Sequence, residues 1–175
     1  MGLYAVYCQT KFNFAVSEAG IFTILNVIAA GSASFVAGKL GDKFGHKTSM
    51  MLAYLGHFIA VLLAIFAQNM FWVYGIFMAI GIGQGAFMPS AMNLVYDFAA
   101  ERDTKTYMAL VDSFLAPFVL LFIMGIGALI RVGNYTTSLY ILGMSIILGM
   151  LILELIVRDP KHSAETVFHV DGFSS

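Results

Sequence analysis

The sequence predicts an all-α protein that crosses a membrane several times as a bundle of helices. Of its 175 residues, 60% are hydrophobic and only 11% are charged, and the mean hydropathy is +0.87. Soluble domains carry about 45–50% apolar and about 25% charged residues, so this surplus is larger than a buried core can hold. Five apolar runs are long enough to cross about 30 Å of hydrocarbon, which takes about 20 helical residues. We therefore expect a polytopic membrane bundle whose solvent is the lipid bilayer.

Short polar stretches divide the chain into these spans. Residues 1–9 are apolar but too short to cross, so we interpret them as the end of a span. After a polar link over residues 10–16, Ser17 and Glu18 are residue types that favour a helix start. The expected complete spans are 19–40, 50–67, 71–96, 107–130 and 135–157, within a transmembrane bundle over 1–160 that is followed by a cytoplasmic tail over 161–175.

Lysine and arginine are unevenly placed between the two sides that these spans define. With the 38–47 turn on the cytoplasmic side, seven of the nine basic residues lie there: Lys39, Lys43, Lys47, Arg102, Lys105, Arg158 and Lys161. The other two, Lys11 and Arg131, lie outside. The positive-inside rule then predicts a cytoplasmic C-terminus. We expect an integral protein of a bacterial inner (plasma) membrane.

Composition and motifs also exclude several classes of function. The single Cys8 excludes an internal disulfide framework and a cysteine-rich metal site. Nine basic residues are balanced by ten acidic ones, which argues against a nucleic-acid partner. The chain has no G-x-S-x-G, H-E-x-x-H or Walker motif, and the first residues do not resemble a signal peptide. We expect neither an enzyme nor a bound metal or cofactor.

The polar stretch Gly38–Lys47 is the densest cluster of charge in the first hundred residues. Gly41 and Gly45 can adopt backbone conformations that other residues avoid, as a tight reversal requires. Asp42 could accept hydrogen bonds from the free N–H groups at the start of the next helix, or pair with Lys43 or with a basic residue of a neighbouring helix. The basic side chains of the stretch suit an anionic leaflet surface. By composition alone, an ordinary basic loop would explain the stretch equally well.

The spacing of this stretch resembles a known signature. The sequence GKLGDKFGHK is similar to G-x-L-[AG]-D-[RK]-x-G-[RK]-[RK] of the major facilitator superfamily, with His46 in place of a basic residue. The matching residues are Gly38, Leu40, Gly41, Asp42, Lys43, Gly45 and Lys47. The resemblance implies a secondary transporter that moves a small solute, with H⁺ or Na⁺ as an open coupling ion, by alternating access. It also implies that the turn belongs to the cytoplasmic gate, with Asp42 bonding to neighbouring helices.

Members of this family have twelve helices in two halves, so the resemblance makes the missing N-terminal half a partner of this chain. The first-half motif l-x-x-x-R-x-x-q-G has only a partial counterpart in Ile80–Gly85, where Gly81 stands in place of Arg. We therefore interpret the chain as the C-terminal half, from the end of helix seven to helix twelve, and the first half stays open. The alternative in a different class is a non-transporting assembly partner or a truncated remnant.

Three amides lie inside the expected spans and are candidates for the substrate cavity: Asn26, Gln84 and Asn93. Intramembrane polar groups are costly without a partner, so each suggests a function. Hydrogen bonding between helices is an equally good explanation for a neutral amide. Gly81, Gly83 and Gly85 around Gln84 would allow close helix approach or a bend.

Two carboxylates are candidates for ion coupling or for ion pairing. Asp112 could pair with Arg102, Lys105 or a lysine of the turn, and we favour this over a proton-coupling role. Glu154 precedes Arg158 by four residues, which predicts an ion pair within one helix. His57 lies among apolar residues, where a packed histidine is commoner than a ligand. Pro89 and Pro117 predict bends in their helices.

Overall fold

The described part of the chain, residues 2–99 and 104–157, forms six helices, five of which are long and apolar enough to cross a membrane. The computed structural model describes residues 2–99 and 104–157. The helices are α1 (Gly2–Phe12), α2 (Val16–Phe44), α3 (His46–Phe66), α4 (Met70–Ala99), α5 (Thr104–Arg131) and α6 (Tyr135–Leu155). The expected all-helical membrane bundle is confirmed. The predicted tail over 161–175 lies outside the described residues.

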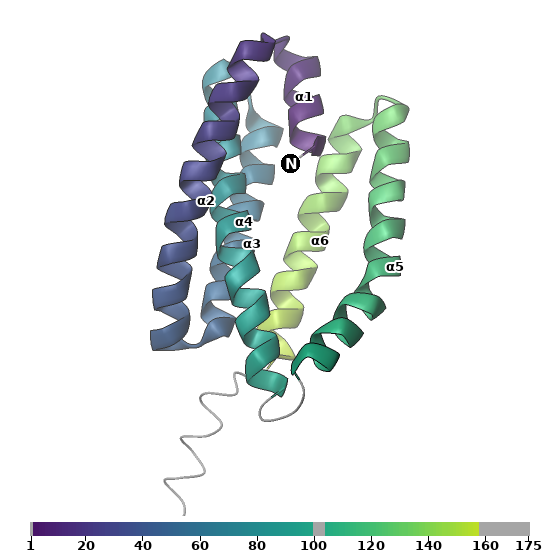
Figure 1. Ribbon diagram of the computed structural model, residues 1–175. Coiled ribbons are helices and arrows are strands. Elements are labelled where there is room, and N and C mark those ends of the chain that lie inside the picture. Colours follow the sequence, from purple (N-terminus) through teal and green to yellow (C-terminus); the bar gives the residue numbers. More distant parts are fainter. Residues whose placement is uncertain (1, 100–103, 158–175) are drawn as a thin grey trace, which may run out of the picture.

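Each helix reverses direction relative to the one before it (Figure 1). The α2–α3 junction, the end of α4, the start of α5 and the end of α6 lie together at one end of the bundle. The α1–α2, α3–α4 and α5–α6 junctions lie at the opposite end. The basic turn, residues 38–47, therefore lies at the same end of the bundle as the end of α6, although more than a hundred residues separate the two in the sequence.

The α2–α3 turn is much shorter than the ten residues that the sequence suggested. Helix α2 continues to Phe44 and α3 begins at His46, so Gly45 alone is non-helical between them. Gly45 has φ 89° and ψ 153°, a conformation open essentially to glycine, and its N–H donates to the Gly41 carbonyl at 3.0 Å. The prediction of a special backbone conformation is right for Gly45 and wrong for Gly41, which is helical.

The start of α2 also differs from the expectation. The N-cap is Ala15 rather than Ser17, and helix α1 extends to Phe12, which shortens the predicted polar link. The carboxylate of Glu18 accepts a hydrogen bond from the Ala15 N–H at 2.9 Å. Glu18 therefore stabilises the helix start, as its residue type suggested. It does so by bonding to the backbone of Ala15, whose side chain has no group that could cap the helix.

Helix α4 lies at the centre of the packed part of the bundle, between α2 and α3 (Figure 1). A cluster of aromatic rings fixes one end of this contact. Phe22 of α2, which is 1% exposed, stacks on Phe77 of α4 with ring centroids 5.1 Å apart. The rings of Phe14 and Tyr74 make T-shaped contacts with the Phe22 ring, with ring centroids 5.1 and 5.2 Å apart. This packing of α2 and α3 around α4 forms the scaffold for the residues considered below.

Helix α5 is packed far less closely than the others, and none of its spanning segment is buried inside the bundle. Figure 1 shows α5 beyond α6, with its first half inclined to its second half, as the interior Pro117 predicts. From Phe114 to Ile130 its side chains are all apolar, including Phe118 and Phe122. Helix α5 therefore presents apolar side chains to its surroundings over most of its length.

Candidate functional site

The residues of the basic turn hold α2 and α3 together at close range. A methyl group on Gly41 would overlap the His46 ring and lie 3.2 Å from the hydroxyl of Ser49. The Ser49 hydroxyl donates to the Ala37 carbonyl of α2 at 2.7 Å, and both residues are buried. Gly41 is therefore needed for close approach between the helices. His46, which replaces a basic residue of the signature, is buried against it at 9% exposure.

The charged residues of the turn have different surroundings. Asp42 and Lys43 are exposed. The Lys39 ammonium lies 4.3 Å from the centroid of the Phe35 ring, a cation–π contact. Lys47 instead reaches across to α6, where its ammonium donates to the main-chain oxygen of Glu154 at 2.9 Å and lies 3.5 Å from its carboxylate. The end of the turn is thus tied to the end of the last helix.

This contact gives Glu154 a partner that the sequence did not suggest. The expected partner, Arg158, lies outside the described residues. The pairing with Lys47 joins two elements that are distant in sequence, so spacing along one helix could not reveal it. The Lys47 side chain is 20% exposed and the Glu154 side chain 58% exposed.

Three glycines of α4 determine which helices can approach it. Methyl groups on Gly81 and Gly85 would collide with the backbone of α2, and a methyl group on Gly83 would collide with the His57 ring of α3. One side of α4 therefore packs against α2, and another side packs against α3. The expected close approach at these glycines is confirmed.

Two polar side chains of α2 bond to the backbone of α4 along the same contact. The Asn26 amide donates to the Phe77 carbonyl at 3.0 Å and is 5% exposed. The Ser34 hydroxyl donates to the Gly85 carbonyl at 2.6 Å. The Asn26 amide group thus joins α2 to α4 by a hydrogen bond. Such bonding between helices is the alternative to a solute contact that the sequence left open.

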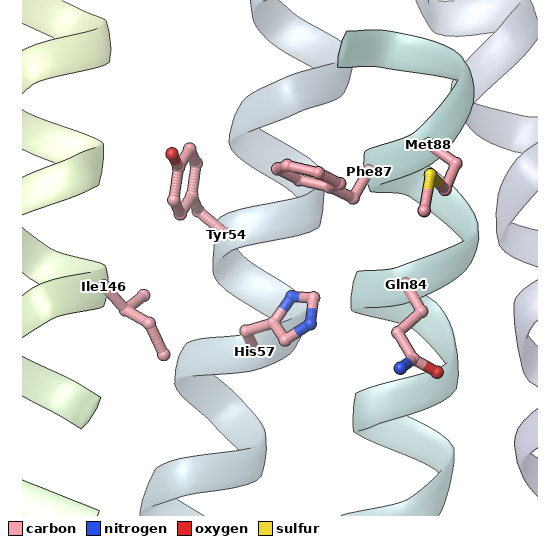
Figure 2. A pocket seen from close by; sticks show the side chains of 6 residues that line it. All are labelled: Tyr54, His57, Gln84, Phe87, Met88 and Ile146. Atoms are coloured by element: carbon pink, nitrogen blue, oxygen red, sulfur yellow. The ribbon is translucent and has the colours of Figure 1, made fainter. Parts of the chain in front are cut away.

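Gln84 lines a cavity of about 400 Å³ between α3, α4 and α6 (Figure 2). The six residues around it are Tyr54, His57, Gln84, Phe87, Met88 and Ile146. The Nδ1 atom of His57 lies 2.9 Å from the Ala53 carbonyl of its own helix. The sequence pointed to Gln84 but gave no sign of Tyr54, because a tyrosine in an apolar run is not informative by itself.

A second cavity of about 490 Å³ adjoins this one and shares His57 and Ile146 with it. Its other lining residues come from α1, α5 and α6: Gly2, Leu3, Tyr4, Phe122, Ile123, Ile126, Gly127, Ile130 and Leu142. These residues are almost all apolar. His57 therefore lines both cavities, one with several polar side chains and one with almost entirely apolar walls.

The remaining candidates lie away from these cavities. Asn93 is half-buried on α4, nine residues beyond Gln84. Asp112 is exposed on α5 and forms no ion pair within residues 2–99 and 104–157. Arg102, one of its expected partners, is outside the described residues. Across the same described ranges, no cluster of three His, Cys, Asp or Glu residues could hold a metal ion.

Comparison with known proteins agrees with this architecture, which is that of a polytopic membrane protein with a basic signature turn. Residues 1–171 match the Major Facilitator Superfamily, and the chain belongs to that superfamily. Its members are transporters rather than enzymes, in agreement with the motifs absent from the sequence. The resemblance seen in the turn is thereby confirmed at the level of the family, while the half that the chain represents is not established.

One curated relative is the "Niacin transporter NiaP" of Acinetobacter baylyi (strain ATCC 33305 / BD413 / ADP1). It is 26% identical to this chain over 98 residues, which are 56% of the chain and 22% of the relative. The matched region is thus less than a quarter of the relative's length. No solved structure matches the chain.

Proposed function

We propose that the chain forms one half of a secondary transporter that moves a small solute across a membrane by alternating access. The observation that carries this proposal is the signature turn, fixed by Gly45 and tied by Lys47 to Glu154 at the end of the bundle. Contacts of this kind at one end of a bundle can form in one state of a gate and break in the other. The other half of the transporter is the proposed partner, and the C-terminal half is the assignment we favour.

The solute we propose to test first is nicotinate, because the curated relative is a niacin transporter. Asn26, Gln84 and Asn93 remain candidates for contacts with the solute. Asp112 is the candidate for coupling to H⁺, and its Asn variant would leave the pH dependence of uptake unchanged if it has no such role. Gln84 is the strongest of the amides, because it lines a cavity and Asn26 is bonded within the protein.

The decisive experiment is uptake of radiolabelled nicotinate into proteoliposomes. The 175-residue chain alone is expected to give no specific uptake, because alternating access requires two halves around the solute. Reconstitution together with a second half should restore uptake, and Asp42→Asn should reduce it. Robust uptake by the chain alone would contradict the proposal that it is half of a transporter. A chain that stays inactive with every second half supplied would favour the alternative, a non-transporting assembly partner or remnant.

The proposed orientation has its own test. In a Cys8→Ala background, Lys39→Cys should react with an impermeant maleimide only from the cytoplasmic side, and Arg131→Cys only from the outside. Cys8 is buried, so its replacement removes background labelling without touching either site. Labelling of both positions from the same side would overturn the topology.

A further inference from the structure

Pro89 lies inside α4 and leaves one carbonyl of that helix without its usual donor. In an α-helix the N–H of each residue donates to the carbonyl four positions earlier, and proline has no N–H. The carbonyl that loses its donor here is that of Gly85. Because Gly85 is buried within the bundle, an unpaired carbonyl at this position would be costly.

The Ser34 hydroxyl of α2 supplies the missing hydrogen bond. It donates to the Gly85 carbonyl at 2.6 Å, across the contact between α2 and α4. The hydroxyls of Thr23 and Ser32 on the same helix behave differently, because each donates to the carbonyl four residues earlier in α2, at 2.9 Å. Ser34 therefore takes the place of the N–H group that Pro89 lacks.

The Ser34 side chain also has a second acceptor close by, the carbonyl of Ala30. This carbonyl lies four residues earlier in α2, which is the position that the Ser32 hydroxyl uses relative to itself. It also lies against Gly85, since a methyl group on Gly85 would collide with the Ala30 carbonyl oxygen. Rotation of Ser34 about χ1 would thus move its hydroxyl from a carbonyl of α4 to a carbonyl of α2. One donor with two alternative acceptors is a contact that can exist in two states.

The residue after the proline adds to the cost of the arrangement seen here. Ser90 is 1% exposed, and its hydroxyl has no hydrogen-bond partner among the described residues. A buried hydroxyl without a partner costs free energy. This cost narrows the gap in free energy to an alternative in which the backbone beyond Pro89 shifts.

We propose that Ser34 is the latch of a hinge in α4 at Pro89. While the Ser34 hydroxyl bonds to Gly85, the part of α4 beyond Pro89 is held against α2. When the hydroxyl turns to Ala30, the Gly85 carbonyl is released and this part of α4 tilts away from α2. It ends at the same end of the bundle as the basic turn (Figure 1). The latch goes beyond the proposed function, because it operates within this chain and needs neither a solute nor a second half.

Carbonyl NMR can observe the latch directly. The sequence contains two Gly–Ala pairs, Gly85–Ala86 and Gly127–Ala128. Labelling with [1-¹³C]glycine and ¹⁵N-alanine therefore gives two carbonyl–nitrogen correlations, the second of which is an internal reference in α5. Gly127→Ala assigns them by removing one signal, and no atom lies within 4 Å of its added methyl group.

In lipid nanodiscs, Ser34→Ala should move the Gly85 carbonyl signal to lower frequency, as the loss of a hydrogen bond does, and leave the Gly127 signal in place. Ser32→Ala is the matched control, because it removes a hydroxyl that bonds within α2. It should leave both signals unchanged. A Gly85 signal that stays in place in Ser34→Ala, or that moves equally in Ser32→Ala, would overturn the assigned hydrogen bond.

A latch that opens also exchanges between two states. Hinge motions of helices occur on the μs–ms timescale, which relaxation dispersion detects. The parent chain should show dispersion at the Gly85 signal and none at the Gly127 signal. Pro89→Ala should abolish it, because the restored N–H holds the Gly85 carbonyl in the helix. A parent chain without dispersion at Gly85 would overturn the hinge.

Pro89→Ala also separates the latch from an ordinary packing contact. In the parent chain, Ser34→Ala should raise the unfolding equilibrium constant about three- to fifteenfold, the range for one hydrogen bond between membrane helices. In the Pro89→Ala background the same change should raise it less than about twofold, since the carbonyl has a donor in its own helix. Circular dichroism in mixed micelles follows unfolding and verifies that each variant folds.

Equal effects of Ser34→Ala in the two backgrounds would contradict the idea that its hydroxyl replaces the N–H missing at Pro89. These measurements contain no solute, so a failure of nicotinate uptake would count against the transport proposal and not against the latch.

Discussion

The side chain of Lys47, at the start of α3, contacts both the main chain and the side chain of Glu154, at the end of α6. The ammonium donates to the Glu154 main-chain oxygen at 2.9 Å and lies 3.5 Å from the carboxylate. The main-chain oxygen belongs to the last turn of α6, where carbonyl groups have no partner within the helix and attract a positive charge. A residue of the signature turn thus secures the end of a helix that is distant in sequence.

This relationship predicts unequal effects from removing the two side chains. Lys47→Ala loses both contacts, whereas Glu154→Gln loses only the charge attraction, so Lys47→Ala should lower the free energy of unfolding more. Because both side chains are partly exposed, the charge term should be below about 1 kcal/mol and should shrink in high salt. Unfolding in mixed micelles, followed by circular dichroism, measures both. Lys43→Ala, an exposed lysine of the same turn, is the control. A larger cost for Glu154→Gln would contradict the main-chain contact.

Gly85 should tolerate no side chain, because its backbone lies against that of Ala30. In Gly85→Ala the new methyl group would meet the carbonyl and Cα of Ala30, and backbone atoms cannot move aside as a side chain can. We expect a loss of about 1–3 kcal/mol in the free energy of unfolding, the usual cost of overpacking. Gly125→Ala in α5 is the matched control, since nothing lies within 4 Å of its added methyl group. Equal stability of the two variants would rule out the close α2–α4 contact.

Two glycines of the signature should respond to alanine in opposite directions. Gly45→Ala forces φ 89° on a residue with a side chain and should cost on the order of 1–3 kcal/mol. Gly38→Ala lies inside α2 with no atom within 4 Å of the added methyl group, and alanine favours a helix by up to about 1 kcal/mol. Thermal unfolding in detergent compares the two. The turn geometry would be wrong if Gly45→Ala were as stable as the parent chain.

Asn26 should contribute to the stability of the bundle, whether or not it also contacts the solute. Asn26→Leu removes the donor to the Phe77 carbonyl and should lower the free energy of unfolding by about 0.6–2 kcal/mol, the range for hydrogen bonds between membrane helices. Thr23→Val, one turn earlier, removes a hydroxyl that bonds only within α2 and should have little effect. An Asn26→Leu chain of unchanged stability that fails in nicotinate uptake would favour the solute role over the packing role.

The sequence by itself determined the membrane solvent, the number of complete spans and the superfamily. These follow from local properties, because a run of about 20 apolar residues can satisfy its backbone in lipid only as a helix. The signature GKLGDKFGHK is equally local, and the special conformation of Gly45 within it was foreseen from residue type alone. The sequence could not distinguish glycine used for a turn from glycine used for close packing, which is why Gly41 was misjudged.

Only the tertiary structure decided which residues meet. The partners of Lys47 and Asn26, and the cavity shared by Tyr54, His57 and Gln84, each join different helices. Such contacts depend on how the helices pack. In this chain that packing depends on where small residues such as Gly83 and Gly85 let two backbones approach. Hydropathy fixes each helix by itself, whereas the site exists only once α3, α4 and α6 lie side by side.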